Sequence, residues 1–546
     1  MSASSTKKLR KEEVIAKQEA KQTAERKEAK KLKTYSIIFG VVLAAMLVFA
    51  VWTAVSQTIS NSGVMERNTV AVTVNDHEIS TAELNIYYIE AINNFYSQYG
   101  SYASMFGLDV TKPLDEQVLD ETTGMTWADD FLNAAKDNLK AVYAMSDLAE
   151  QAGHALTEEE LTNIDTTLAN LEAYGMLYGY GDGDTYLKAM YGNGCSVELF
   201  RAYLERTALA DSYYASYGES LTYEDADLRA AEAENYNQYS SFTYTFYTLN
   251  VNKFLTGGTT AEDGTVTYSD EERAAAVAAA EEAAKALTAE EIVTVEDLDA
   301  AIAALEINAE VEGAASTTYT DYPYANVSTT IREWLSDEAR VAGEKTYLAN
   351  TSTSTDENGN EVTTTNSYIV VFYHSTNDNT TPLVNVRHIL IPYEGGTTDE
   401  NGITVYSEDE KLAAEATGVD LLAQWETAGG TVEAFAALAN EHSTDTGSNT
   451  NGGLYENVYP GQMVPTFNDW CFDESRRVGD TGLVHTDYGC HVMYFEGART
   501  TTYRDFMITN ALKSADIEAW YTSCLENVTV TDVNLKYIQT DLVLGG

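Results

Sequence analysis

Basic residues are scarce in this sequence of 546 residues, which has 33 Lys and Arg against 85 Asp and Glu and a formal net charge of −52. So large a negative charge excludes a nucleic-acid backbone as the partner. The few basic residues are also unevenly placed. Residues 1–33 hold 11 of them together with five Glu, which leaves a net charge of −58 on the rest of the chain. The two parts are therefore expected in different surroundings.

Cysteine is rare as well, with four residues scattered along the chain: Cys195, Cys471, Cys490 and Cys524. Four cysteines are too few for a scaffold held by disulfides, and their spacing matches no metal site. We expect them to be small apolar residues of the core, although an exported chain would permit a disulfide. The sequence implies no metal and no cofactor.

Charge is absent from Tyr35 to Val55, a run of 21 mostly apolar residues. At about 1.5 Å per residue, a helix of this length spans a bilayer core of ~30 Å. We predict a transmembrane anchor at 35–55, a basic cytoplasmic tail at 1–34 and a polar linker at 56–69. The basic tail stays cytoplasmic by the positive-inside tendency, so the acidic bulk of the chain is extracytoplasmic. A cleaved signal peptide is the alternative, but the run is longer than a usual apolar core and no cysteine follows it to accept lipid.

Residues 70–239 are predicted to form a mostly helical domain. The domain opens with the alternating, strand-like VAVTVNDHEIS, and the helical TAELNIYYIEAINNFY follows. Apolar residues recur at helical spacing in four later segments: Trp127–Gln151, Thr157–Glu172, Val197–Tyr217 and Tyr223–Tyr239. Tyrosine is frequent in AYGMLYGYGDGDTYLKAMYGNG, where it suits either a half-buried core or a surface that contacts extended peptides.

An internal repeat relates residues 240–378 to residues 384–498. Matching islands follow in the same order in both copies: GGTT, then TYS against VYS, then TVE, and finally a Trp with Asp-Glu, Arg and Gly at equal spacing. A hairpin-like insertion, NTSTSTDENGNEVTTTN, lengthens the first copy. Two domains of one fold are the simplest interpretation.

Each copy is predicted to run strand, glycine-containing loop, two helices, a Trp-bearing helix and a closing strand, which makes a compact α+β unit. The fold class is therefore multidomain α+β: one anchor helix, a helical domain, the two repeats and a helical C-terminal segment at 499–546. The end of that segment, VTVTDVNLKYIQTDLVL, is strand-like or extended, and packing against the helical domain is one arrangement open to it.

Two histidines stand out in the second copy. In the strand VNVRHILI, His388 shares a pleat face with Val386 and Leu390 because alternate side chains point the same way. In the closing strand, His491 shares a face with Met493. If the two strands pair, the two imidazoles can meet.

The second copy resembles the parvulin family of peptidyl-prolyl cis-trans isomerases through RHIL, HSTDTGSNTNGGLY, PGQMVPTF and HTDYGCHVMYF, in consistent order and spacing. The resemblance implies that His388 and His491 are the paired core histidines, with Asp445 at the acidic or thiol position and Thr486 supporting them. It implies a proline pocket made by Leu454, Met463 and Phe467. Two departures from the family are NGGLY where GGDLG is frequent, and Tyr488 where a small hydroxyl residue is common.

The first copy lacks these features. Its opening strand FTYTFYTLNV has no histidine. In its closing strand YIVVFY, Tyr368-Ile369 occupies the region of Cys490-His491, and the nearby His374 is expected beyond that closing strand. We interpret residues 240–378 as a degenerate parvulin-like domain that serves as a spacer or a peptide-binding surface.

The helical domain is similar to the N-terminal chaperone part of PrsA- and SurA-like exported foldases, through VAVTVNDHEIS with its following helix and the helical segment at Trp127. A generic helical spacer is the alternative. The resemblances together imply a peptidyl-prolyl isomerase and chaperone for newly exported, unfolded, proline-containing polypeptides at the outer face of the cytoplasmic membrane. A noncatalytic holdase and a surface interaction protein that reuses the fold are the competing hypotheses.

Overall fold

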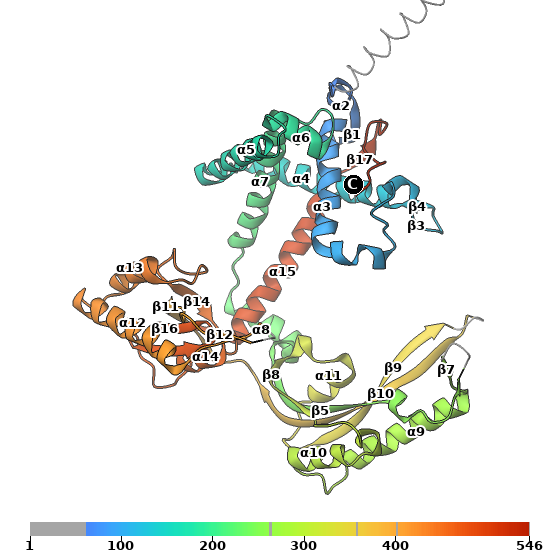
Figure 1. Ribbon diagram of the computed structural model, residues 1–546, viewed down its shortest axis with the longest axis vertical. Coiled ribbons are helices and arrows are strands. Elements are labelled where there is room, and N and C mark those ends of the chain that lie inside the picture. Colours follow the sequence, from blue (N-terminus) through green and yellow to red (C-terminus); the bar gives the residue numbers. More distant parts are fainter. Residues whose placement is uncertain (1–61, 261–264, 356–358, 400–401, 545–546) are drawn as a thin grey trace, which may run out of the picture. The chain divides into compact units, whose positions relative to one another are not determined.

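A computed structural model describes residues 62–260, 265–355, 359–399 and 402–544 (Figure 1). The predicted tail at 1–34 and anchor at 35–55 lie outside the described residues. Within the ranges that the structure describes, no helix combines the length and the apolar character needed to cross a bilayer. The chain divides into two compact units. One holds the residues up to Leu221 and from Asp516 onward, and the other is Thr222–Ala515.

The first unit is mostly helical, as predicted, and a small sheet opens it. Its elements are α2 (Val64–Asn68), β1 (Val70–Val74), β2 (His77–Ser80), α3 (Thr81–Tyr99), β3 (Val118–Asp120), β4 (Met125–Thr126), α4 (Trp127–Ala152), α5 (Glu158–Leu177), α6 (Gly183–Tyr191), α7 (Val197–Ser220), the second half of α15 (Tyr503–Leu525) and β17 (Val530–Asp532). The short helix α2 stands where the sequence suggested only a linker. The helix α4 begins at a capping box in which Thr126 and Asp129 bond each other's backbone N–H.

The C-terminal strand belongs to this first sheet. Strand β17 pairs antiparallel with β1, where Val72 faces Asp532 and Val74 faces Val530, so the strand order is β17-β1-β2. The chain end therefore packs against the helical domain, the arrangement that the sequence left open.

The second unit contains the two repeats. The elements are α8 (Asp225–Glu234), β5 (Ser241–Asn250), β6 (Thr259–Thr260), β7 (Val266–Thr267), α9 (Asp270–Leu287), α10 (Val295–Ala303), β8 (Thr317–Pro323), α11 (Thr329–Leu335), β9 (Lys345–Thr355), β10 (Glu361–Asn377), β11 (Pro382–Ile391), β12 (Thr397–Thr398), β13 (Thr404–Val405), α12 (Glu408–Thr427), α13 (Val432–His442), β14 (Leu454–Val458), α14 (Pro465–Cys471), β15 (Thr481–Thr486) and β16 (Gly489–Thr502). The sheets have the orders β8-β5-β10-β9 and β14-β11-β16-β15. Corresponding strands of the two copies occupy the same places in the two sheets. The internal repeat predicted from the sequence is therefore also a repeat of sheet topology.

The matching sequence islands make matching contacts. In the first repeat Glu272 caps α9 through Ser269 and accepts a hydrogen bond from the N–H of Gly258, 2.9 Å away. In the second repeat Glu410 does the same for Gly396 at 2.7 Å. The Arg that follows each Trp helix lies over the indole: Arg340 over Trp334 and Arg476 over Trp470, each at 4.0 Å.

The cysteines behave as small core residues. Cys195, Cys471 and Cys490 are buried, Cys524 is half-buried, and all four are free thiols. Burial raises the pKa of Cys471 to about 12, so its thiol stays neutral.

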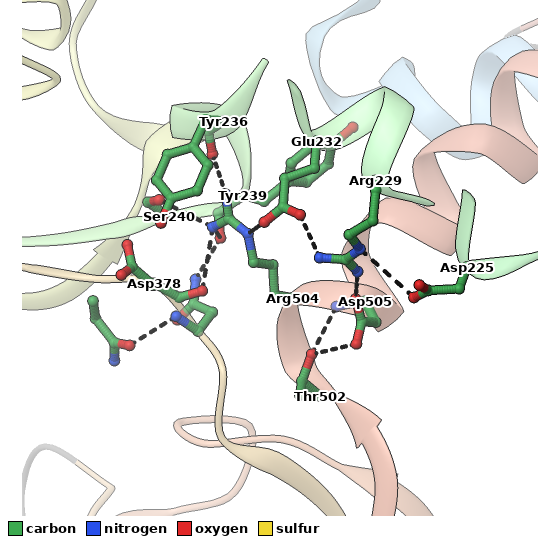
Figure 2. Close-up of polar contacts among 12 residues, drawn as sticks. Asp225, Arg229, Glu232, Tyr236, Tyr239, Ser240, Asp378, Thr502, Arg504 and Asp505 are labelled. Atoms are coloured by element: carbon green, nitrogen blue, oxygen red, sulfur yellow. Dashed lines mark hydrogen bonds and ion pairs between the residues drawn. The ribbon is translucent and has the colours of Figure 1, made fainter. Parts of the chain in front are cut away.

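A buried arginine at the start of α15 ties together the segments that flank the repeats (Figure 2). Arg504 is 2% exposed, and its guanidinium pairs with Glu232 of α8. The guanidinium also donates to the backbone carbonyls of Tyr236 at 2.7 Å and Asp378 at 3.2 Å and lies 4.0 Å from the centre of the Tyr236 ring. Its backbone N–H donates to the carbonyl of Asn379. The entry and exit of the first repeat are thereby bonded to the helix that follows the second.

We predict that Arg504→Met lowers the free energy of unfolding of the second unit by about 3 kcal/mol. The change leaves the carbonyls around the guanidinium and Oε1 of Glu232 without their buried donor, while Oε2 of Glu232 stays paired with Arg229. Scanning calorimetry of the full chain measures the effect as a lower melting temperature of one transition. Arg499→Met, which removes an exposed arginine nearby in the sequence, is the matched control. Equal shifts for both variants would contradict the prediction.

Candidate functional site

The sheet of the second repeat brings the two predicted histidines together. Strands β11 and β16 pair antiparallel at its centre, with His388 opposite Met493 and Leu390 opposite His491. The imidazoles are diagonal neighbours on one face, their ring centres are 5.1 Å apart, and the ring planes differ by 19°. Their Nδ1 atoms lie 2.9 Å apart, which is hydrogen-bond distance. Both side chains are almost fully buried, at 3% and 5% exposed.

Hydrogen bonds extend this pair at both ends. Nε2 of His388 lies 2.9 Å from Oδ2 of Asp445, and Nε2 of His491 lies 2.8 Å from the hydroxyl of Thr486. The hydroxyl of Tyr455 donates to the same Oδ2 of Asp445 at 3.0 Å. The predicted residues His388, Asp445, Thr486 and His491 therefore form one continuous chain of hydrogen bonds.

Burial and hydrogen bonding determine which groups in this chain of hydrogen bonds are charged. Loss of hydration lowers the pKa of His491 to about 4, and proximity to His388 adds to the effect. Burial also lowers the pKa of His388, although its bond to Asp445 opposes the shift. For Asp445, burial alone would raise the pKa, but hydrogen bonds from Ser448, His388 and Tyr455 outweigh it and hold the pKa at about 2. At neutral pH the site thus contains two neutral imidazoles and one carboxylate.

These charges fix the direction of every hydrogen bond. An ionised Asp445 only accepts, so Nε2 of His388 carries a proton and its Nδ1 is an acceptor. Nδ1 of His491 must then be the donor in the bond between the rings, and its Nε2 accepts from the hydroxyl of Thr486. The backbone N–H of Tyr488 donates to that hydroxyl at 3.1 Å, which leaves the Thr486 proton free to point at His491.

The loop that carries Asp445 is held by backbone contacts with β11. The N–H of His388 donates to the carbonyl of Gly453 at 2.9 Å, and Gly453 has φ of 72°. A Cβ at this position would lie 2.2 Å from the carbonyl oxygen of His388, so only glycine fits. Arg387 donates to the carbonyls of Asn451 and Gly452 at 3.0 and 2.9 Å. The NGGLY sequence therefore serves the close approach of the loop to the histidine strand.

A cavity of about 290 Å³ opens beside the histidines. Its walls come from β11, β14, α14 and the turn between β15 and β16, and they are mostly apolar or aromatic: His388, Leu390, Asp445, Tyr455, Gln462, Met463, Val464, Phe467, Tyr488 and His491. Phe467 presents its ring nearly perpendicular to both imidazoles, with centre distances of 5.4 and 5.3 Å. Two of the three predicted pocket residues, Met463 and Phe467, line this cavity.

Leu454, the third residue predicted for the pocket, is not part of the cavity. In the pairing of β11 with β14 it lies opposite Arg387, whereas Tyr455 lies opposite Val386, which shares its face with His388. Alternation therefore turns Leu454 away from the cavity and Tyr455 toward it. Tyr455 is not among the residues predicted from the sequence, although strict alternation along LYENV with the correct register identifies it. Ser448, whose hydroxyl donates to Asp445, is likewise a member of the site that was not predicted.

The first repeat has no counterpart of the histidine pair. Gly343 bonds Tyr373 as Gly479 bonds Phe495, which aligns β10 with β16. That alignment places Ile369 at the position of His491. Since Val371 lies opposite Phe246 and Met493 lies opposite His388, Phe246 takes the place of His388. Stacked tyrosines, Tyr319 and Tyr322 at 4.2 Å, pack against the same face. Aromatic side chains thus occupy the region that is polar in the second repeat.

Comparison with known families agrees with the geometry of the second repeat. Residues 369–498 match the family described as PPIC-type PPIASE domain. The second repeat is a parvulin-type domain. Residues 26–213 match the family described as SurA-like N-terminal domain, so the chain combines an N-terminal domain of this type with the parvulin-type domain.

Individual relatives match over shorter stretches. Foldase protein PrsA 1 of Listeria innocua is 33% identical over 112 residues, which are 20% of this chain and 30% of the relative. Chaperone SurA of Chromohalobacter salexigens is 36% identical over 115 residues, covering 21% and 22%. The chain thus spans less than a third of the length of these two relatives. The crystal structure of peptidylprolyl isomerase (PrsA) from Bacillus anthracis covers 27% of this chain and 59% of its own, with 21% identity and a TM-score of 0.17.

The lowered pKa values predict how the site responds to acid. An unfolded histidine has its ordinary pKa near 6.5. Between pH 6.5 and 4, His491 is therefore protonated in the unfolded chain and neutral in the folded one. The contribution of His491 to the free energy of unfolding is present in full above this range and falls by on the order of 3 kcal/mol as the pH drops through it. Imidazole NMR of the full chain should place the pKa of His491 near 4. Titration of both paired histidines near 6.5 would contradict the assignment of neutral rings.

Proposed function

We propose that the chain is a peptidyl-prolyl cis-trans isomerase and chaperone, and that the parvulin-type domain of the second repeat carries the catalysis. The observation that carries the proposal is the buried, hydrogen-bonded pair His388–His491 beside an apolar cavity. The family match of residues 369–498 supports it. Its substrates are unfolded polypeptides with accessible X-Pro bonds.

The reaction needs no covalent step, because its barrier is rotation about an amide. Resonance holds the X-Pro bond planar, and rotation costs about 18 to 20 kcal/mol. Met463 and Phe467 would hold the proline ring in the cavity, which fixes one side of the bond. The twisted amide is less polar than the planar one, so a desolvated cavity favours the transition state over the ground state.

The neutral histidines suit this task better than charged ones. A protonated imidazole would attract the planar, more polar amide and bring hydration into the cavity. The carboxylate of Asp445 is saturated by Ser448, His388 and Tyr455. In this proposal it keeps the histidine protons in place, while Thr486 does so at the other end of the chain.

We predict that His388→Ala lowers kcat/KM for a proline peptide by about tenfold or more, the equivalent of at least ~1.4 kcal/mol of transition-state stabilisation. Exchange NMR of the peptide with the full chain measures the rate directly. His374→Gln, in the first repeat, is the matched control and should leave the rate unchanged. Equal rates for wild type and His388→Ala, with circular dichroism showing that both proteins are folded, would contradict the proposed catalytic centre.

The chaperone part of the proposal rests on apolar side chains exposed by the first unit. The end of α5 carries Met176 at 61% and Leu177 at 73% exposed, with Tyr174 and Tyr178 exposed beside them. These residues belong to the tyrosine-rich segment for which the sequence left two interpretations open. Their exposure favours contact with extended, apolar segments of client chains over a role in the core. The SurA-like N-terminal match supports this use.

The double variant Met176→Ser, Leu177→Ser should weaken the suppression of client aggregation about twofold or more, since it removes apolar area available to clients. Light scattering of a heat-denatured client with the full chain measures this. Val341→Ser removes another exposed apolar residue, 62% exposed, and should have no effect. Isomerase activity should be unchanged in both variants, and a loss of aggregation suppression in both alike would argue against a specific surface.

We further propose that the acidic part of the chain works outside the cytoplasmic membrane and that residues 35–55 anchor it. The support is the charge asymmetry around the uncharged run. The competing hypotheses give different results in the same assays. Suppression of aggregation without isomerisation would select the noncatalytic holdase, and binding of one folded partner with neither activity would select the surface interaction protein.

A further inference from the structure

The loop that forms one wall of the histidine cavity is held from outside the cavity by a pair of stacked rings. This loop connects β14 to α14 and contributes Gln462, Met463 and Val464 to the wall. At its start, the ring of Tyr459 stacks on the ring of Tyr503, the first residue of α15. The ring centres are 4.4 Å apart and the planes differ by 1°. The helix that follows the second repeat therefore contacts the loop that forms this wall.

A tight turn connects Tyr459 to the cavity wall. The carbonyl of Tyr459 accepts from the N–H of Gln462 at 3.1 Å, and the side-chain oxygen of Gln462 accepts from the N–H of Tyr459 at 3.1 Å. Gly461 has φ of 83°, the left-handed value that a type II turn requires at its third residue. Its N–H donates to the side chain of Asn468 in α14 at 2.7 Å. A displacement of Tyr459 would therefore displace Gln462 and the wall with it.

The other ring of the stack is fixed by contacts of its own. The N–H of Tyr503 donates to the carbonyl of Thr381 at 2.9 Å, and the N–H of Arg504 donates to the carbonyl of Asn379 at 2.7 Å. Phe506, one turn further along α15, has its ring centre 6.4 Å from that of Tyr459. Aromatic pairs in such geometries stabilise each other beyond the area they bury. The start of α15 is thus a fixed aromatic platform for the turn.

The first repeat does not offer this stack. Pro323 stands eleven residues before Trp334, as Tyr459 stands eleven residues before Trp470. A proline at this position has no aromatic ring to place on a helix. The stack therefore belongs to the repeat that has the paired histidines, and the common fold does not require it.

We propose that Tyr459 and Tyr503 are positioning residues of the isomerase, whose stack holds the turn that places Met463 against the substrate proline. The inference rests on the proposed function, because it takes Met463 to hold the proline ring. Contacts with the ring are made in the planar and in the twisted amide alike, so a looser wall weakens the binding of both states. Loss of the stack should therefore raise KM and leave kcat nearly unchanged.

Exchange NMR of a proline peptide with the full chain, over a range of peptide concentrations, separates KM from kcat. Tyr503→Ala should raise KM about fivefold and change kcat by less than about twofold. Tyr459→Ala should do the same, and the double variant should be no worse than either, because all three remove one stack. Tyr503→Phe keeps the ring and should stay within about twofold of wild type.

Tyr217→Ala is the matched control. It removes another stacked ring from α15, since Tyr217 lies on Trp520 with centres 3.9 Å apart. This stack lies in the first unit, so its loss should leave KM unchanged. An unchanged KM in Tyr503→Ala, a fall in kcat alone, or an equal rise of KM in Tyr503→Phe or Tyr217→Ala would overturn the proposal. Should Tyr503→Ala fail to fold, Tyr459→Ala decides in the same way.

The failure of this proposal differs from the failure of the proposed function. If wild type isomerises no peptide, the proposed function fails, and the methyl signal of Met463 in the free chain then decides whether the stack positions the wall. A shift of this signal in Tyr503→Ala that is absent from Tyr503→Phe and Tyr217→Ala upholds the positioning. An unchanged signal, or the same shift in Tyr217→Ala, overturns it.

Discussion

The hydrogen bond between the Nδ1 atoms of His388 and His491 is the interaction on which the rest of the site depends. Two buried imidazoles can share such a bond only when one Nδ1 carries a proton and the other does not. Burial supplies that condition, because it keeps both rings neutral. Asp445 at one end and Thr486 at the other select which nitrogen carries each proton. The loop with its paired glycines brings Asp445 within hydrogen-bonding distance of one ring, and the turn before β16 brings Thr486 within reach of the other.

The two repeats show how much of this arrangement belongs to the fold and how much to the side chains. Strand order, the capped helix after the glycine loop and the Arg-over-Trp contact are common to both. At the positions of the histidines the first repeat has Phe246 and Ile369, which are apolar and pack with neighbouring tyrosines. The fold is therefore compatible with an apolar core at this place. The chain of hydrogen-bonded side chains is an addition in the second repeat, and each of its buried polar groups needs a hydrogen-bond partner.

Much of the fold and of the histidine site could be predicted from the sequence, because local sequence patterns indicate them. Alternation places His388 and His491 on faces that meet, the islands reveal the repeat, and the helix caps lie where Ser or Thr precedes an acidic residue. Leu454 was assigned to the pocket by the resemblance alone, and the register of β14 against β11, which pairs Tyr455 and not Leu454 with Val386, is set by long-range pairing that no local pattern reports. The Arg504 network joins residues more than 100 positions apart, so it too has no local signature.

In the proposed function, the proline of a client chain binds in the cavity next to the paired histidines and nowhere else in the two repeats. Methyl labelling of the methionines and valines of the full chain tests it, because Met463 lines that cavity. Val327 precedes Trp334 by seven residues, as Met463 precedes Trp470, and so occupies the corresponding place in the first repeat. With a saturating proline peptide, we expect intermolecular nuclear Overhauser effects between the proline ring protons and the Met463 methyl group, whose signal is identified by its loss in Met463→Leu. Contacts of the proline ring with the Val327 methyl groups, or with neither residue, would contradict it.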